Sequence, residues 1–230
     1  MIKGKGLIAS TLSDFENDTS VLIFASGVSN SGEIREEEYK REKDLLLSVL
    51  SEKARLIYFS TCSVFDRSLI DSRYVRHKLE MEKLLADNSS NYLIMRLPIL
   101  VGRTANPNTF FNFICDRVRS NATIQVHKYA WRYLFDAEDL KKVFPIILLE
   151  TQKEDIRQIN VAFNNAASVP SIVEMIEKIT GKKVRKEIIE NGSNYDFDKA
   201  PFNLILEKNK IVIDLRNYNY VVLKKYLIDK

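Results

Sequence analysis

Short apolar runs alternate with amphipathic helical patterns through the first two thirds of the chain. The runs at residues 20–27, 54–61 and 91–100 are rich in Val, Ile, Leu and Phe, which is typical of strands buried on both faces. Residues 36–53 and 74–87 between them place apolar side chains at helical spacing. This order predicts a parallel sheet covered by helices on both faces, a Rossmann-like α/β fold.

The pattern continues less regularly towards the C-terminus. Residues 131–150 are expected to form a strand and then a helix, with Asp136 as the helix N-cap. A short strand is expected at 158–163 and an amphipathic helix at 168–184, ended by Gly181. The remaining residues indicate a small lobe of short elements.

The chain of 230 residues is long enough for one core with a small appended lobe. We expect the Rossmann-like core at residues 1–163, with residues 104–130 contributing to a substrate lobe. Residues 164–230 are expected to form the small C-terminal, substrate-binding lobe. Because no Pro/Gly-rich linker separates them, the lobe is expected to pack on the core.

Composition indicates a globular protein, 45% hydrophobic and 29% charged, without an apolar run that could cross a membrane. We therefore expect a cytoplasmic protein with no membrane and no nucleic-acid partner, since the net charge of +4 is spread over mixed runs. The charged run at 33–44 is interpreted as a solvated helix face. Two separated cysteines give no metal-binding cluster, and His77 and His127 are expected on the surface.

Three predicted strands end in small or polar residues. These are Ala25, Ser26 and Gly27 after the first run, Thr61 after the second and Leu97 after the third. Because ligands of parallel α/β sheets gather at the carboxyl ends of the strands, these positions are expected to line one crevice.

Tyr74 and Lys78 are four residues apart on a predicted helix and therefore share a face. A phenol has a pKa near 10, and lowering it by roughly three units for proton transfer at neutral pH takes about 4 kcal/mol. A nearby ammonium group can supply that preference, and Thr61 could donate a hydrogen bond to a substrate carbonyl. The spacing alone is also typical of a packed tyrosine beside a solvated lysine, so the context decides.

Several segments follow one another in a fixed order along the chain: SVLIFASG (20–27), IYFSTCSVF (57–65), YVRHK (74–78), RLPILVG (96–102), WRYLFDAEDL (131–140) and INVAFNNAASVPSIVEMIEKITGKKV (159–184). In these segments and their order the chain resembles the extended short-chain dehydrogenase/reductase family of nucleotide-sugar epimerases, dehydratases and 4-keto reductases. The resemblance implies an NAD- or NADP-dependent reductase or epimerase that acts on a nucleotide-activated sugar, in surface-polysaccharide precursor synthesis.

The resemblance also implies roles for particular residues. Thr61, Tyr74 and Lys78 would be catalytic, and Thr61, Ser63, Asn108 and Arg132 would bind the substrate, with Arg132 on its diphosphate. The cofactor would be bound by Gly4, Gly6, Ala9, Ala25, Ser26, Gly27, Tyr74, Lys78 and Leu97. A surface role for Arg132 beside its aromatic neighbours is the alternative.

The chain departs from the family at its start. Gly4, Gly6 and Ala9 form a glycine fingerprint, but only Met1 to Lys3 precede it, and the following helix leads directly into the strand at 20–27. The usual second and third strands are therefore missing, and the adenosine-binding half is curtailed. The adenine could be exposed, held by a neighbouring subunit or not bound, and NAD cannot be distinguished from NADP.

Other departures concern the reaction. Cys62 and Ser63 replace the acidic pair of the 4,6-dehydratases, so dehydration is disfavoured, and Cys62 is expected in the core. Reduction and epimerisation remain open, with reduction favoured by STCSVFD. The rival hypothesis is a non-catalytic sugar-nucleotide-binding or assembly protein that has lost dinucleotide binding; RNA binding has only the mild charge in its favour. The resemblance also suggests a homodimer formed through the helices after Ser31 and Tyr74.

Overall fold

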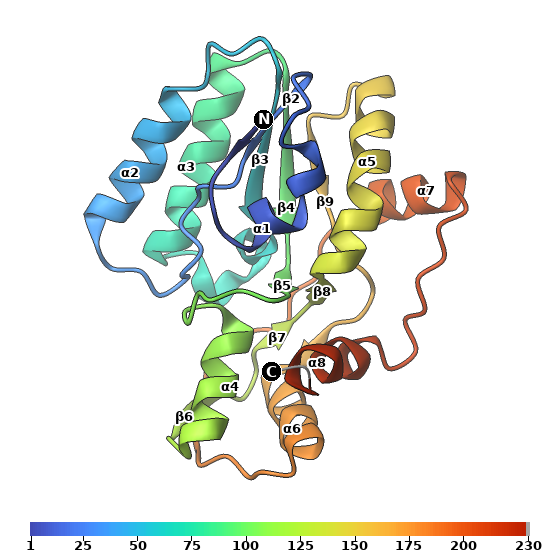
Figure 1. Cartoon of the computed structure of the whole chain (residues 1–230). Coiled ribbons are helices and arrows are strands. Elements are labelled where there is room, and N and C mark those ends of the chain that lie inside the picture. Colours follow the sequence, from blue (N-terminus) through green and yellow to red (C-terminus); the bar gives the residue numbers. More distant parts are fainter. Residues whose placement is uncertain (229–230) are drawn as a thin grey trace.

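The centre of the molecule is a parallel sheet of five strands, which lies in the upper half of Figure 1. The computed structural model describes residues 1–228. The strands lie in the order β1-β2-β3-β4-β9, with bounds Ile2–Lys3, Val21–Phe24, Arg55–Thr61, Tyr92–Leu97 and Gln158–Asn160. Because β1 pairs directly with β2, the predicted Rossmann-like sheet without the usual second and third strands is confirmed.

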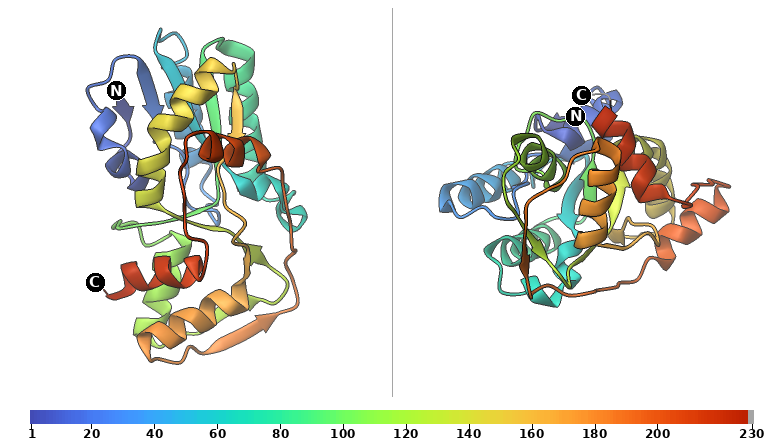
Figure 2. Two further views of the ribbon diagram at one scale, coloured as in Figure 1. Left: turned by 90° about the vertical axis from the view of Figure 1, so that its right-hand side faces the viewer. Right: turned by 90° about the horizontal axis from the view of Figure 1, so that it is seen from below.

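Helices cover both faces of this sheet because successive strand residues point to opposite sides. Val21 and Ile23 belong to one apolar cluster, whereas Leu22 and Phe24 belong to another. The second cluster lies under α2 and α3, and the first under α1 and α5 (Figures 1 and 2). The bounds of α1, α2, α3 and α5 are Leu7–Thr11, Glu36–Leu47, Arg73–Asn88 and Ala137–Lys153.

A second, smaller body lies beyond the carboxyl ends of the strands, at the bottom of Figure 1. It is formed by α4, β6, α6, β11 and α8, with bounds Phe110–Ser120, Ile124–His127, Val169–Thr180, Lys186–Ile189 and Tyr218–Ile228. Strands β6 and β11 pair in parallel, which joins the segment after residue 104 to the C-terminal part of the chain.

Short paired strands connect the two bodies. They are β5 (Ile99–Val101) with β8 (Leu134–Asp136), and β7 (Trp131–Arg132) with β10 (Ala167–Ser168). Three single turns of 3₁₀ helix lie at Ser13–Phe15, Cys62–Phe65 and Arg67–Leu69. The helix α7 (Ala200–Lys208) returns to the sheet and packs against α5 and β9, as Figure 2 also shows.

The helix ends agree with the capping residues expected from the sequence. The Asp136 carboxylate accepts a hydrogen bond from the backbone N–H of Glu138 at 2.9 Å at the start of α5. Gly181, at φ +67°, ends α6 in the left-handed conformation that glycine adopts without strain. Within residues 1–228, none of the helices combines the length and the apolar character needed to cross a bilayer.

Candidate active site

The expected residues at the strand ends do meet at one edge of the sheet. Thr61 ends β3 and pairs in register with Leu97, the last residue of β4. Ser26 and Gly27 follow β2, the strand on the other side of β3. Since β2, β3 and β4 run parallel, all these residues lie at the same, carboxyl edge.

Tyr74 reaches this edge because of the way in which α3 begins. The Ser72 hydroxyl caps the helix by accepting a hydrogen bond from the Val75 N–H at 3.1 Å, so Tyr74 lies in the first turn. There it lies beside Thr61, whose side chain acts to lower the pKa of the Tyr74 hydroxyl. Lys78, one turn later, places its Nζ 5.9 Å from the centroid of the Tyr74 ring. The structure therefore brings Thr61, Tyr74 and Lys78 together.

The surroundings of Tyr74 act on its proton in opposite directions. Burial raises the pKa of Tyr74 above the usual value for a phenol. The positive charge of Lys78 lowers this pKa, the negative charge of Glu42 raises it, and the neighbouring Thr61 side chain lowers it. In this arrangement Tyr74 carries its proton at neutral pH and can donate it.

The Lys78 ammonium is enclosed at the end of β2. Its side chain is 3% exposed, and Nζ donates hydrogen bonds to Glu42 Oε1 at 2.9 Å and to the Tyr58 hydroxyl at 3.3 Å. A Cβ atom added to Gly27 would lie only 2.6 Å from Nζ. The absence of a side chain at Gly27 therefore leaves room for the ammonium beside the strand end.

Glu42, on α2, is a member of this site that sequence reasoning missed. It lies in the charged run that the sequence pattern assigns to a solvated helix face, yet it is 0% exposed. Burial alone would raise its pKa, but the charge of Lys78, the nearby His77 ring and hydrogen bonds from the Tyr58 hydroxyl and the Val28 N–H hold that pKa well below its usual range. Its buried neighbours Tyr39 and Leu46, three and four residues away, give the helical spacing that could have revealed it.

The prediction of a surface position for His77 is wrong. The side chain is 1% exposed, because α2 packs against the face of α3 that carries it. Its ring lies 4.8 Å from the ring of Tyr39, and its Nε2 lies 3.1 Å from Glu42 Oε2. His77 is thus part of the surroundings of Glu42.

The two glycines of the fingerprint have different surroundings. Gly4 has φ +145°, and a Cβ atom there would lie 2.3 Å from the carbonyl oxygen of Ala25, so the close approach of β1 to β2 requires glycine. Gly6 precedes α1, and a Cβ atom added to it would have nothing within 4 Å. Ala9 is buried in α1, which has only 5 residues and so offers a short helix dipole.

Arg132, expected on the substrate diphosphate, already has an acidic partner. Its Nη1 lies 2.9 Å from Asp66 Oδ2 and also donates to the carbonyl of Trp131 at 2.7 Å. Ser63 is half-buried in the 3₁₀ turn after β3, whereas Asn108 is exposed and its N–H donates to Asn106 Oδ1 at 2.9 Å. The hydrogen-bond partners of Arg132 and Asn108 thus lie outside the cluster of Thr61, Tyr74 and Lys78.

Cys62 is a core residue, as predicted. It is 0% exposed and packs in an aromatic cluster with Tyr133, Tyr195 and Phe197. Burial raises the pKa of its thiol well above the usual value. Cys62 is therefore not available as a thiolate nucleophile.

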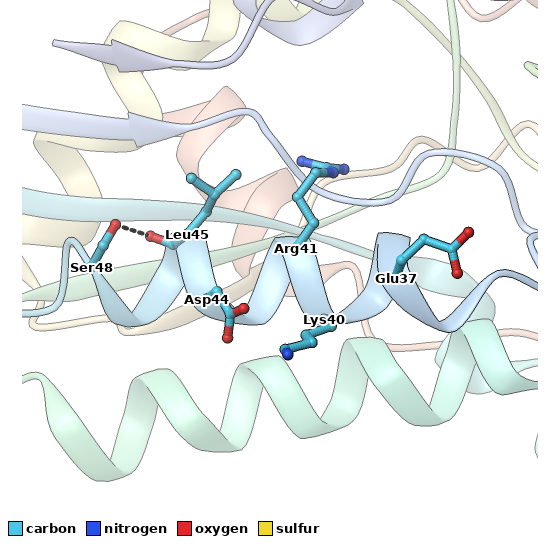
Figure 3. Close-up of a pocket in the computed structure, with 6 residues that line it drawn as sticks. All are labelled: Glu37, Lys40, Arg41, Asp44, Leu45 and Ser48. Atoms are coloured by element: carbon cyan, nitrogen blue, oxygen red, sulfur yellow. Dashed lines mark hydrogen bonds between the residues drawn. The ribbon is translucent and has the colours of Figure 1, made fainter.

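A pocket of about 440 Å³ lies elsewhere, on the outer face of α2 (Figure 3). Its lining is Glu37, Lys40, Arg41, Asp44, Leu45 and Ser48. The Arg41 guanidinium is directed to the loop after β2, where Nη1 donates to the Ser26 carbonyl at 3.1 Å. The pocket contains none of the expected catalytic residues.

Within residues 1–228, no group of three or more His, Cys, Asp or Glu side chains is placed to hold a metal ion.

Solved structures with similar folds are nucleotide-sugar enzymes. One is UDP-glucuronic acid 4-epimerase from Bacillus cereus in complex with UDP-glucuronic acid and NAD, with a TM-score of 0.66, 18% identity, and coverage of 98% of this chain and 80% of that chain. Another is UDP-N-acetylglucosamine 4-epimerase from Methanobrevibacter ruminantium, with a TM-score of 0.69, 14% identity, and coverage of 98% and 82%. A dTDP-4-dehydrorhamnose reductase from Clostridium acetobutylicum has a TM-score of 0.62, 18% identity, and coverage of 96% and 85%.

No protein-family model and no curated protein matches the sequence. The identities to these solved structures are all low, so the likeness establishes a shared fold. The predicted resemblance to the extended short-chain dehydrogenase/reductase enzymes is thereby confirmed at the level of fold.

Proposed function

We propose that this chain is a reductase or epimerase that uses NAD or NADP and acts on a nucleotide-activated sugar. The observation that carries the proposal is the grouping of Thr61, which acts on the pKa of Tyr74, with Tyr74 and with the Lys78 ammonium 5.9 Å from the Tyr74 ring. These groups lie at the carboxyl edge of a parallel sheet, where ligands of such folds bind. The similar folds of an epimerase that holds UDP-glucuronic acid and NAD, and of a sugar reductase, support it.

Each side chain has a role that follows from its position. Tyr74 donates a proton to the carbonyl oxygen of the sugar in reduction and accepts one from the alcohol in oxidation. Thr61 orients that oxygen against the Tyr74 hydroxyl. Lys78 stabilises the phenolate through its positive charge, which lowers the pKa of Tyr74.

The residues present fit the nicotinamide half of a dinucleotide. When bound, that group would supply or accept the hydride. The open backbone at Gly6 leaves space for a pyrophosphate, and Gly27 adjoins the Lys78 ammonium. The strands that would bind the adenosine half of the dinucleotide are missing from this chain. Because those strands would distinguish NAD from NADP, the proposal includes both.

A non-catalytic nucleotide-sugar-binding or assembly protein is the second candidate. The specific observation in its favour is that the two cations expected to meet ligands are both held by buried carboxylates. Lys78 is paired with Glu42, and Arg132 with Asp66, which is 1% exposed. A protein that binds no dinucleotide could retain such pairs as structural elements.

The proposal extends to the setting of the protein. A sugar nucleotide is a precursor of polysaccharides, and we propose a cytoplasmic role in surface-polysaccharide precursor synthesis.

We also propose a homodimer formed through α2 and α3, whose outer faces carry partly exposed Leu45, Leu47 and Leu79. Light scattering of the purified chain tests the dimer, since Leu47→Glu should convert it to a monomer.

Titration of the purified protein with NADH and NADPH, by calorimetry or nicotinamide fluorescence, tests the central claim. Binding of one of them at micromolar to millimolar concentration is expected, and it should be strengthened or unaffected by UDP-glucose or dTDP-glucose. Binding of the sugar nucleotide with no binding of either dinucleotide at millimolar concentration would favour the non-catalytic candidate.

A further inference from the structure

The carboxylate of Glu42 lies where three elements and a loop meet. It projects from α2, and its two oxygens contact groups from the loop after β2, from β3 and from α3. Oε2 accepts a hydrogen bond from the Val28 N–H at 2.6 Å. Oε1 accepts hydrogen bonds from the Tyr58 hydroxyl at 2.7 Å and from Lys78 Nζ at 2.9 Å.

We propose that Glu42 is a positioning residue that holds the Lys78 ammonium beside Gly27, in reach of Tyr74 and of a bound dinucleotide. The inference rests on the proposed function for its catalytic meaning, and it assigns to a residue of α2 a part in a site otherwise formed by strand ends and α3.

The physical reason is the freedom of a lysine side chain. Four rotatable bonds let an ammonium take many positions, and enclosing it without a partner is costly. Glu42 is itself fixed, since Val28, in the loop after β2, and Tyr58, in the middle of β3, both donate to it. The carboxylate therefore transmits the position of β3 and of the loop after β2 to the Lys78 Nζ.

The geometry also leaves part of the ammonium for a ligand. An ammonium has three N–H groups. Within residues 1–228, Lys78 donates two hydrogen bonds, to Glu42 Oε1 and to the Tyr58 hydroxyl. The third N–H remains for a hydroxyl group of the ligand at the strand end, where Gly27 has no side chain to block the approach.

Glu82 provides a matched control on the same helix layer. It is also a buried glutamate, 6% exposed, and it binds a cation, Arg96, and a strand hydroxyl, that of Ser60. Neither of these hydrogen bonds involves Lys78. Loss of either carboxylate should lower stability, but only loss of Glu42 should release Lys78.

Pulsed amine acylation of the protein without ligands, followed by peptide mass spectrometry, tests the geometry directly. The labelling rate of Lys78 is normalised to that of Lys83, whose side chain is 77% exposed. In Glu42→Gln the Lys78 rate should rise at least about tenfold, the change expected when roughly one hydrogen bond to a charged group is lost. In Glu82→Gln the normalised Lys78 rate should stay within about twofold of the wild-type rate. A general loss of stability affects Lys78 and Lys83 alike and so cancels in the ratio.

Two results would overturn the inference. One is an unchanged Lys78 rate in a folded Glu42→Gln protein, and the other is an equal rise in Glu82→Gln. Circular dichroism checks that each variant folds. If Glu42→Gln does not fold, Glu42→Asp takes its place: it keeps the charge but is one methylene shorter, so a several-fold rise is expected and an unchanged rate overturns the inference.

Affinity for NADH separates this inference from the proposed function. Glu42→Gln should weaken NADH binding about tenfold, or roughly 1.4 kcal/mol, and this effect should disappear when Lys78→Met is already present. Wild-type protein that binds no dinucleotide would contradict the proposed function, while the labelling rates would still decide whether Glu42 holds Lys78. Wild-type protein that binds NADH while Lys78 labelling is indifferent to Glu42 would overturn only the inference.

Discussion

Arg132 and Asp66 form an ion pair between the connecting strand β7 and the turn that follows β3, with Nη1 2.9 Å from Oδ2. Asp66 is 1% exposed and also accepts hydrogen bonds from Ser68 and from Ser193, in the segment before α7. The guanidinium has five N–H donors in a planar fork, so it can contact a phosphate while it remains bound to Asp66.

Arg132→Met should weaken binding of UDP-glucose and dTDP-glucose by about tenfold or more, since a charged hydrogen bond to the diphosphate is lost. It should also lower the free energy of unfolding by roughly 3 kcal/mol, because Asp66 is left buried without its cation. Asp66→Asn, which frees the guanidinium, should keep or improve the affinity. Calorimetry measures the affinities of both variants, with the exposed Arg119→Met as the control. Full affinity in Arg132→Met would contradict the role of Arg132 in binding.

Tyr74→Phe should reduce kcat by about a thousandfold, within the usual range for loss of a proton donor, and should leave NADH affinity within about threefold. Initial rates with a 4-keto sugar nucleotide and calorimetry measure the two quantities. The control is Tyr129→Phe, because Tyr129 is 48% exposed and lies outside the site. Full activity in Tyr74→Phe would remove Tyr74 from the mechanism.

Lys78→Met should move the pH dependence of alcohol oxidation to higher pH. Oxidation needs the Tyr74 phenolate, so its rate rises with pH up to the pKa of Tyr74. Burial already raises that pKa, and loss of the Lys78 charge, which lowers it, should raise it further. Profiles of kcat against pH check this. Lys78→Arg, which keeps the charge, should shift the profile less, and an unchanged profile in Lys78→Met would show that Lys78 does not act on Tyr74.

Gly4→Ala and Gly6→Ala should have different effects. Gly4→Ala brings a Cβ atom to 2.3 Å from the Ala25 carbonyl oxygen at a φ of +145°, so unfolding should become easier by about 2–3 kcal/mol. Gly6, at φ −84° with open space around it, should tolerate alanine within about 1 kcal/mol. If a pyrophosphate approaches Gly6, however, the added methyl group should weaken NADH binding. Thermal unfolding and calorimetry separate the two effects.

Glu42→Gln should lower stability in a pH-dependent way. The folded pKa of Glu42 lies below its ordinary value of 4.5, so its ionised form favours the folded state. This contribution is fully present above about pH 4.5 and is lost as the pH falls towards the folded pKa. The difference in unfolding free energy between wild type and variant, from urea titrations, should therefore be largest near neutral pH and shrink in acid. A difference that does not depend on pH would indicate that lost packing, and not the charge, is responsible.

The sheet and the pairing of Tyr74 with Lys78 on one helix face could be predicted because their signals are local. Runs such as Val21–Phe24 are apolar at every position since both faces are covered, and the spacing of Tyr74 and Lys78 is fixed by one helix. The partners of Lys78 and Arg132 could not be predicted in this way. Glu42 and Asp66 reach them only through the packing of α2 on α3 and of β7 beside the turn after β3, which no short stretch of sequence encodes.

The error for His77 has the same origin. The spacing within α3 places His77 on a face away from Tyr74, and the sequence of that helix alone does not show what this face meets. In the structure it meets Tyr39 of α2. A charged helix such as α2 can therefore bury one acidic residue, Glu42, between Tyr39 and Leu46, while its remaining charges lie outward.

The shortened sheet is bounded on both sides by brief strands, β1 with 2 residues and β9 with 3. Edge strands expose unpaired backbone groups that can recruit strands from other molecules, and brevity is one way in which proteins prevent this. A sheet missing two strands would be prone to aggregation if its new margin were long and apolar. Here the margin at β1 is too short to serve as a template for such growth.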